Sequence, residues 1–244
     1  MLKHLQEIKN VNIIINFRFL ILFLSFAVQS QNTKDSLVID VKIQFNNQDL
    51  ELNKKFISTL NDTIYFDKIK FYLSDIQLVY KDKKQFTETK SYYLIDLDKF
   101  ESMRFSIPHQ NKTKIESLKF NIGIDSLASI SGALEGVLDA TNGMYWAWQS
   151  GFVNFKIEGK SSSCASRKNK FQFHIGGYLD PNYALRSVVI PVQNIQFTNH
   201  GLNLIMDLGK LFSEIKLKET NSIMIPGKEA MKIADLSTQL FSIE

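Results

Sequence analysis

Strict alternation of apolar and polar residues is the feature that most constrains the fold of this chain. It is clearest in residues 39–45, which read Ile-Asp-Val-Lys-Ile-Gln-Phe. Side chains of an extended chain point to opposite faces in turn, so such a segment predicts a strand with one buried face. The same alternation recurs in four more segments, 118–124, 153–158, 171–175 and 202–208. Weaker candidates are residues 68–80, 92–97, 187–192 and 195–198.

These segments predict an all-β fold of roughly eight to ten strands, because few helical stretches lie between them. A parallel α/β sheet needs crossover helices, so the pattern favours an antiparallel β-sandwich or barrel. Helical spacing is found mainly near the C-terminus, over residues 228–241 and, for a shorter helix, 209–216. The polar stretch 159–170 is predicted to be a long mobile loop between two strands, with Cys164 exposed in it.

The first thirty residues have the composition of an export signal. Residues 19–27 form a short, largely apolar run that is preceded by Arg18 and followed by Val28-Gln29-Ser30. A basic start, a short apolar stretch and small residues before a cleavage point are typical of a secretory signal peptide. The alternative is a retained membrane anchor, but the uncharged run is too short to span a bilayer. We therefore expect a signal peptide over 1–30 and a β-rich domain over 31–244, periplasmic or secreted and without stable membrane insertion.

Composition excludes several classes of function. The formal charge of +4 comes from 29 basic and 25 acidic residues. Residues 1–30 contain three basic residues and one acidic residue, so the mature chain keeps 26 basic and 24 acidic residues. This small excess of positive charge does not indicate binding to nucleic acid. A single Cys excludes a disulfide framework, a Cys-based zinc site and an iron–sulfur cluster.

Enzyme signatures are also missing from the sequence. It has no Gly-x-Ser-x-Gly, no phosphate-binding glycine loop, no His-Glu-x-x-His and no Cys-x-x-Cys. Carboxylates such as Asp125, Glu135 and Asp139 could meet in space, which sequence alone does not test. We therefore expect a protein that is not an enzyme.

Both tryptophans occur in one unusual segment, residues 142–152, which reads Asn-Gly-Met-Tyr-Trp-Ala-Trp-Gln-Ser-Gly-Phe. On an extended chain Trp146 and Trp148 project from one face, because side chains alternate. Two interpretations stay open. The pair could be core aromatic residues after an Asn-Gly turn, or an oxidisable, π-rich site beside a ligand.

His174 is the other candidate site residue. Within the predicted strand 171–175 it shares a face with Gln172, opposite the apolar residues, and two glycines that permit close approach follow the strand. Neutral imidazole is a good ligand for copper or zinc, although a lone His can equally be an ordinary surface residue. His109 and His200 lie in a predicted loop and turn, and neither belongs to a metal-spaced pair.

Residues 120–159 resemble the core signature of the MbnP-like copper-binding proteins, a family named for a methanobactin-associated periplasmic member. The most specific part is Gly-Met-Tyr-Trp-x-Trp-x-x-Gly followed by Lys-x-Glu-Gly. Residues 70–76, 93–96 and 171–178 are similar to further blocks of the family. Their order and spacing cover nearly the whole mature chain.

The resemblance implies a secreted, β-rich copper-binding protein without catalysis of its own. In characterised members a tryptophan is oxidised to kynurenine by a partner dihaem protein of the MbnH type, similar to cytochrome c peroxidases. The kynurenine then binds copper together with histidine. Carried onto this sequence, the resemblance implies a metal site made of His174 with Trp146 or Trp148.

One position departs from the family pattern. Many members of the family also carry a His in the first strand, whereas residues 41–47 contain none here. Met144, a carboxylate or His109 are the candidates for a further ligand. The rival hypothesis is a metal-free β-sandwich module that binds a protein or a glycan at the cell surface, with the Trp pair as core or as a stacking platform.

Overall fold

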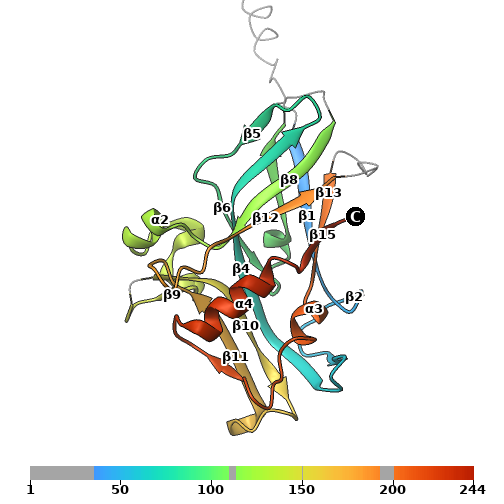
Figure 1. Ribbon diagram of the computed structural model, residues 1–244, viewed down its shortest axis with the longest axis vertical. Coiled ribbons are helices and arrows are strands. Elements are labelled where there is room, and N and C mark those ends of the chain that lie inside the picture. The colour runs from blue at the N-terminus through green and yellow to red at the C-terminus, as the bar shows by residue number, and fades with distance from the viewer. Residues whose placement is uncertain (1–35, 110–113, 150, 193–200) are drawn as a thin grey trace, which may run out of the picture. The chain divides into compact units, whose positions relative to one another are not determined.

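The computed structural model describes residues 36–109, 114–149, 151–192 and 201–244, and residues 36–244 form one unit. Two curled sheets dominate it, and the fold is all-β, as predicted (Figure 1). Nine of the strands in the described residues have five residues or more. The expected signal peptide over 1–30 and the candidate strand 195–198 lie outside the described residues. Among the residues that the structure describes, no helix has the length and apolar character needed to cross a membrane.

The smaller sheet is built around the first alternating segment. Its strand order is β15-β13-β1-β2, with β7 also paired to β1. The pairing of β1 with β13 is parallel, which differs from the antiparallel prediction. A parallel neighbour needs a long connection, and most of the domain lies between these two strands. The bounds are β1 (Ser36–Phe45), β2 (Gln48–Asp49), β7 (Arg104–Pro108), β13 (Gly201–Asp207) and β15 (Phe241–Ile243).

The larger sheet is organised by β4, an 18-residue strand that pairs with five others. The order is β12-β8-β4-β10-β11-β14, with β3, β5 and β6 also paired to β4, and β9 paired to β10. The bounds are β3 (Lys55–Ile57), β4 (Thr63–Tyr80), β5 (Gln85–Thr87), β6 (Tyr92–Asp96), β8 (Ile115–Ile122), β9 (Tyr145–Trp146), β10 (Gly151–Ser161), β11 (Lys170–Gly176), β12 (Arg186–Pro191) and β14 (Ser222–Ile223).

Short helices connect and cover the strands. The α-helices are α2 (Ser126–Ile130), α3 (Gly209–Phe212) and α4 (Lys228–Ser237), and the 3₁₀-helices are η1 (Phe100–Met103), η2 (Gly136–Leu138), η3 (Ala140–Asn142) and η4 (Arg167–Asn169). The helix predicted over 228–241 therefore stops at Ser237, and Phe241 begins β15 instead. The shorter prediction, 209–216, is confirmed only over its first turn.

The main core lies between the two sheets and is rich in phenylalanine. Phe45 of the smaller sheet packs against Phe66 of the larger one at 5.6 Å between ring centroids, and Phe71 packs against Phe241 at 5.9 Å. These residues occupy the apolar positions of the alternating strands, and burying aromatic side chains of this size contributes much of the driving force for folding.

A second, smaller core lies on the other face of the larger sheet. Residues 124–152 cross this face, and buried apolar residues of that segment pack onto it; the cluster comprises Tyr72, Leu94, Ile124, Ala128, Leu138, Met144, Trp146, Phe152 and Val153. The larger sheet is therefore covered on both faces. Its polar positions, which alternation alone would assign to solvent, are partly enclosed.

The polar stretch after β10 differs from its prediction. β10 continues to Ser161, η4 covers 167–169 and β11 begins at Lys170, so the connection is short. Cys164 is buried, with 2% of its surface exposed, and the expectation that it is exposed was wrong. The loop folds back on itself, since Asn169 Nδ2 donates to the Cys164 carbonyl at 2.9 Å.

Candidate functional site

His174 lies on the second face of the larger sheet, opposite the apolar residues of β11, as the alternation predicts. It faces Lys156 across the β10–β11 pairing, and its Nε2 is 2.7 Å from Oε1 of Glu158. The side chain is buried, with 7% of its surface exposed, because residues 124–152 cover this face. A buried imidazole that is held by a carboxylate has a fixed orientation, which is how proteins prepare a histidine ligand.

Trp146 reaches the same face of β11 from a different element. It belongs to β9, where it pairs with Gly151, and its ring lies over Gly176. A Cβ at Gly176 would stand only 2.7 Å from Cζ3 of the indole, so the absence of a side chain there admits the ring. Gly176 follows His174 by two residues, about 7 Å along the strand and on the same side.

The two tryptophans differ sharply in their surroundings. Trp146 is 7% exposed, whereas Trp148 is 62% exposed. Their ring centroids are 5.6 Å apart, with the planes tilted by 44°. The expected proximity of the two rings is therefore present, but one ring is part of the second core and the other lies at the surface. Met144 is fully buried in the same core.

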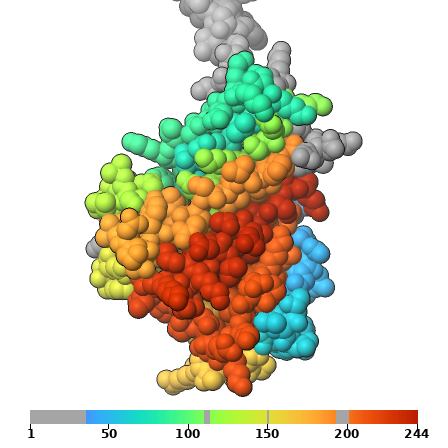
Figure 2. Space-filling model, viewed as in Figure 1, coloured from blue at the N-terminus to red at the C-terminus, as the bar shows by residue number. Residues whose placement is uncertain are grey.

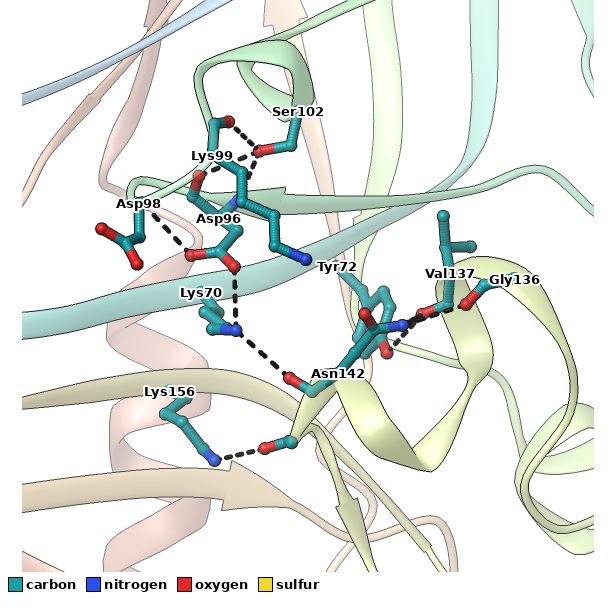
Figure 3. A network of polar contacts seen from close by, with 11 residues as sticks. Lys70, Tyr72, Asp96, Asp98, Lys99, Ser102, Gly136, Val137, Asn142 and Lys156 are labelled. Atoms are coloured by element: carbon teal, nitrogen blue, oxygen red, sulfur yellow. Dashed lines mark hydrogen bonds and ion pairs between the residues drawn. The ribbon is translucent and has the colours of Figure 1, made fainter.

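A polar network holds the segment that carries Trp146 (Figure 3). Lys70 Nζ is 2.8 Å from Asp96 Oδ2 and donates to the Asn142 carbonyl at 3.2 Å. Lys156 Nζ donates to the next carbonyl, that of Gly143. Two lysines of the sheet thus bind consecutive carbonyls just before the Met-Tyr-Trp sequence and fix where it crosses the sheet.

The same network affects the chemistry of its members. Burial lowers the pKa of the Lys156 amine, because the charged form loses hydration. Tyr72 also contributes, since its hydroxyl donates to the Val137 carbonyl at 2.9 Å. None of these residues was singled out by the sequence analysis. The sequence placed Lys70 and Lys156 inside predicted strands, but alternation assigned both side chains to solvent.

The donor atoms near His174 define what this site could hold. Glu158 supplies a carboxylate beside the imidazole, a donor pair that suits copper or zinc. Within the described ranges, no group of three or more His, Cys, Asp or Glu side chains is placed to bind a metal. His109 is engaged elsewhere, with its Nδ1 3.2 Å from the Tyr80 hydroxyl. His200 lies outside the described residues.

The His174–Glu158 pair gives a prediction about stability. The hydrogen bond from His174 holds the pKa of the Glu158 carboxyl below its usual value of 4.5. A lowered carboxyl pKa stabilises the fold above pH 4.5, and that contribution is lost as the pH falls through the folded pKa. Glu158→Gln is expected to lower the free energy of unfolding by about 1 kcal/mol at pH 7. In urea titrations, the difference in unfolding free energy between Glu158→Gln and the parent should become smaller below pH 4.5. A difference that does not change with pH would contradict this prediction.

Comparisons with known proteins agree with this architecture. A family model described as MbnP matches residues 34–225. The fold is similar to a solved structure described as MbnP from Methylosinus trichosporium, with a TM-score of 0.60 and 12% identity, over 79% of this chain and 82% of that chain. At this identity the likeness shows a common fold. No curated protein matches the chain by sequence.

Proposed function

The chain belongs to the MbnP family, and from this premise we propose that it is a periplasmic or secreted copper-binding protein without catalytic activity of its own. The copper would be held by His174 and by an oxidised tryptophan, kynurenine, with the Glu158 carboxylate beside them. The MbnP family is associated with methanobactin and copper, which supports a role in copper handling.

The observation that carries this proposal is the position of Trp146 over Gly176, on the face of β11 that also presents His174. Indole has no lone pair suited to a metal, but ring opening gives an aryl amine and a ketone at the same place. These groups would supply the donors that the His174–Glu158 pair lacks. We therefore assign the oxidation to Trp146, since Trp148 is directed into solvent.

The oxidation needs an external partner, for which we propose a dihaem protein of the MbnH type. Cleavage of the indole C2–C3 bond inserts two oxygen atoms at the level of water and removes four electrons and four protons. The electrons pass to the two oxidised haem irons of the partner in successive rounds, between which a peroxide re-oxidises the irons and is itself reduced to water. Hydrolysis of the resulting formyl group then releases formate, so that the residue has gained one oxygen and lost one carbon overall.

The proposal is tested by comparing the mature chain before and after incubation with an MbnH-type dihaem protein and its oxidant. We expect only the treated protein to retain Cu(I) after gel filtration, at one copper per oxidised chain. Peptide mass spectrometry should place the modification at residue 146. The proposal would be wrong if the untreated protein retained as much copper as the treated protein, or if the treated protein bound no copper.

The exposure of Trp148 favours a second candidate, a metal-free β-sandwich module that binds a protein or a glycan by stacking on this ring. This second candidate requires that neither the treated nor the untreated protein binds copper. The copper measurement above therefore separates the two candidates.

A further inference from the structure

Six exposed apolar side chains, Trp148 among them, lie on segments that adjoin one another. Each of them is at least 41% exposed, although most residues of these types in the described chain are buried. Monomeric proteins rarely display such groups together unless they bind something. They come from α2, from η2 and the segment leading into it, from the turn after β9 and from the turn after β11. We call the following set the Trp148 patch: Leu127, Ile130, Leu134, Val137, Trp148 and Leu179.

Direct contacts show that these segments adjoin. The Ser126 hydroxyl at the start of α2 donates to the Tyr178 carbonyl at 2.9 Å, beside Leu179. The Tyr178 ring packs on Gly151, which pairs with Trp146. Figure 2 shows the yellow-green surface of α2 beside the orange surface of the segment after β11. A groove of about 440 Å³ opens next to α2, with Leu127 and Leu134 on its wall and Lys90 also in its lining.

The stretch 120–155, which holds five of the six patch residues, carries acidic side chains as its only charged groups, whereas Lys90 of another segment lines the groove. Between Lys119 and Lys156 the sequence has no Lys or Arg, although the whole protein has 29. The same stretch contains Asp125, Glu135 and Asp139. Two of these have local structural roles, because Asp125 caps α2 through the Ala128 N–H and Asp139 binds Thr141. An apolar patch in an acidic stretch of chain fits a partner surface with an apolar centre and a basic rim.

We propose that the Trp148 patch is the docking surface for the oxidising haem protein, with Trp148 at the centre of the contact. This rests on the proposed oxidation of Trp146. The Trp146 ring is too buried for a second protein to contact it. It lies against the Trp148 ring, which is exposed and can be contacted. Each electron that leaves Trp146 passes through the Trp148 ring and reduces one oxidised haem iron of the partner.

The test replaces two exposed residues of α2 by lysine. Leu127→Lys with Ile130→Lys removes apolar contact area and opposes the basic rim of the partner, while neither side chain belongs to a core. Matched controls are Phe100→Lys and Val189→Lys, which are 91% and 60% exposed on η1 and β12. The probe is the MbnH-type dihaem protein of the same organism. Its dissociation constant is measured by calorimetry, and kynurenine formation is followed by mass spectrometry.

We expect the double variant to bind the dihaem protein at least about tenfold more weakly and to form kynurenine correspondingly more slowly, with both controls unchanged. Parent-like binding and oxidation of the double variant would overturn the docking surface and leave the proposed function standing. If the parent binds the dihaem protein through this patch but forms no kynurenine, the proposed function fails and the docking surface survives. If the parent sediments as a dimer and the double variant as a monomer, the patch binds a second copy of this chain, and the proposal is overturned.

Discussion

The Trp146→Phe variant is expected to form no kynurenine at position 146 and to lose essentially all copper binding after treatment with the dihaem protein. Phenylalanine retains an aromatic ring over Gly176, so the fold is kept, but it cannot yield the aryl amine and ketone. Losing a direct ligand should weaken copper binding by more than the about 10- to 100-fold that is typical for an outer-shell change. The measurement is a competitive Cu(I) titration with a chromogenic chelator.

The matched control is Trp148→Phe, which changes the other ring of the same pair. Trp148 is largely exposed and lies outside the second core. After exhaustive oxidation this variant should reach the copper stoichiometry of the parent, although at a lower rate, because Trp148 acts in docking rather than in ligation. The reverse outcome, with copper lost in Trp148→Phe and kept in Trp146→Phe, would show that the assignment of the oxidised residue is wrong.

The second large effect is expected from Gly176→Ala. The added Cβ would stand 2.4 Å from the Phe152 carbonyl oxygen and 2.7 Å from Cζ3 of Trp146. One of these atoms belongs to the backbone of a central strand, so relief requires displacement of β10 or of the Trp146 ring. Overpacking of this kind should cost about 3 kcal/mol of unfolding free energy. We also expect a shift of the tryptophan fluorescence, since Trp146 moves.

Gly227→Ala serves as the control for that substitution. Gly227 precedes α4, and nothing lies within 4 Å of the position that its Cβ would take. Because Gly227 is the N-cap residue of α4, alanine there should cost no more than about 1 kcal/mol of unfolding free energy, well below the effect of Gly176→Ala. If urea titrations gave similar values for both variants, the close approach of Trp146 to β11 would not be a constraint on the fold.

Alternation predicted the main strands of this chain because a sheet with one buried core face imposes a period of two on its sequence. β1, β10 and β11 follow that rule, and the position of His174 opposite the apolar residues follows from it too. Sequence analysis missed β15, whose three residues show too little of the pattern, and β7, whose alternation extends over only five residues.

The second core could not be predicted from the pattern, because it depends on a segment of irregular structure that folds over the sheet. Alternation assigns Lys156 and Glu158 to solvent, whereas the crossing of 124–152 encloses them beside His174. The different exposure of Trp146 and Trp148 has the same origin. Trp146 in β9 packs against Gly176, the last residue of β11, whereas Trp148 lies in the following turn and is largely exposed.

The most direct test of the account is a crystal structure of the oxidised, Cu(I)-loaded chain, with anomalous diffraction recorded at the copper edge. The account predicts one copper peak in contact with the His174 imidazole, and electron density for kynurenine at position 146 with an intact indole at 148. Copper bound at any place remote from His174, or an unmodified Trp146 beside bound copper, would contradict it.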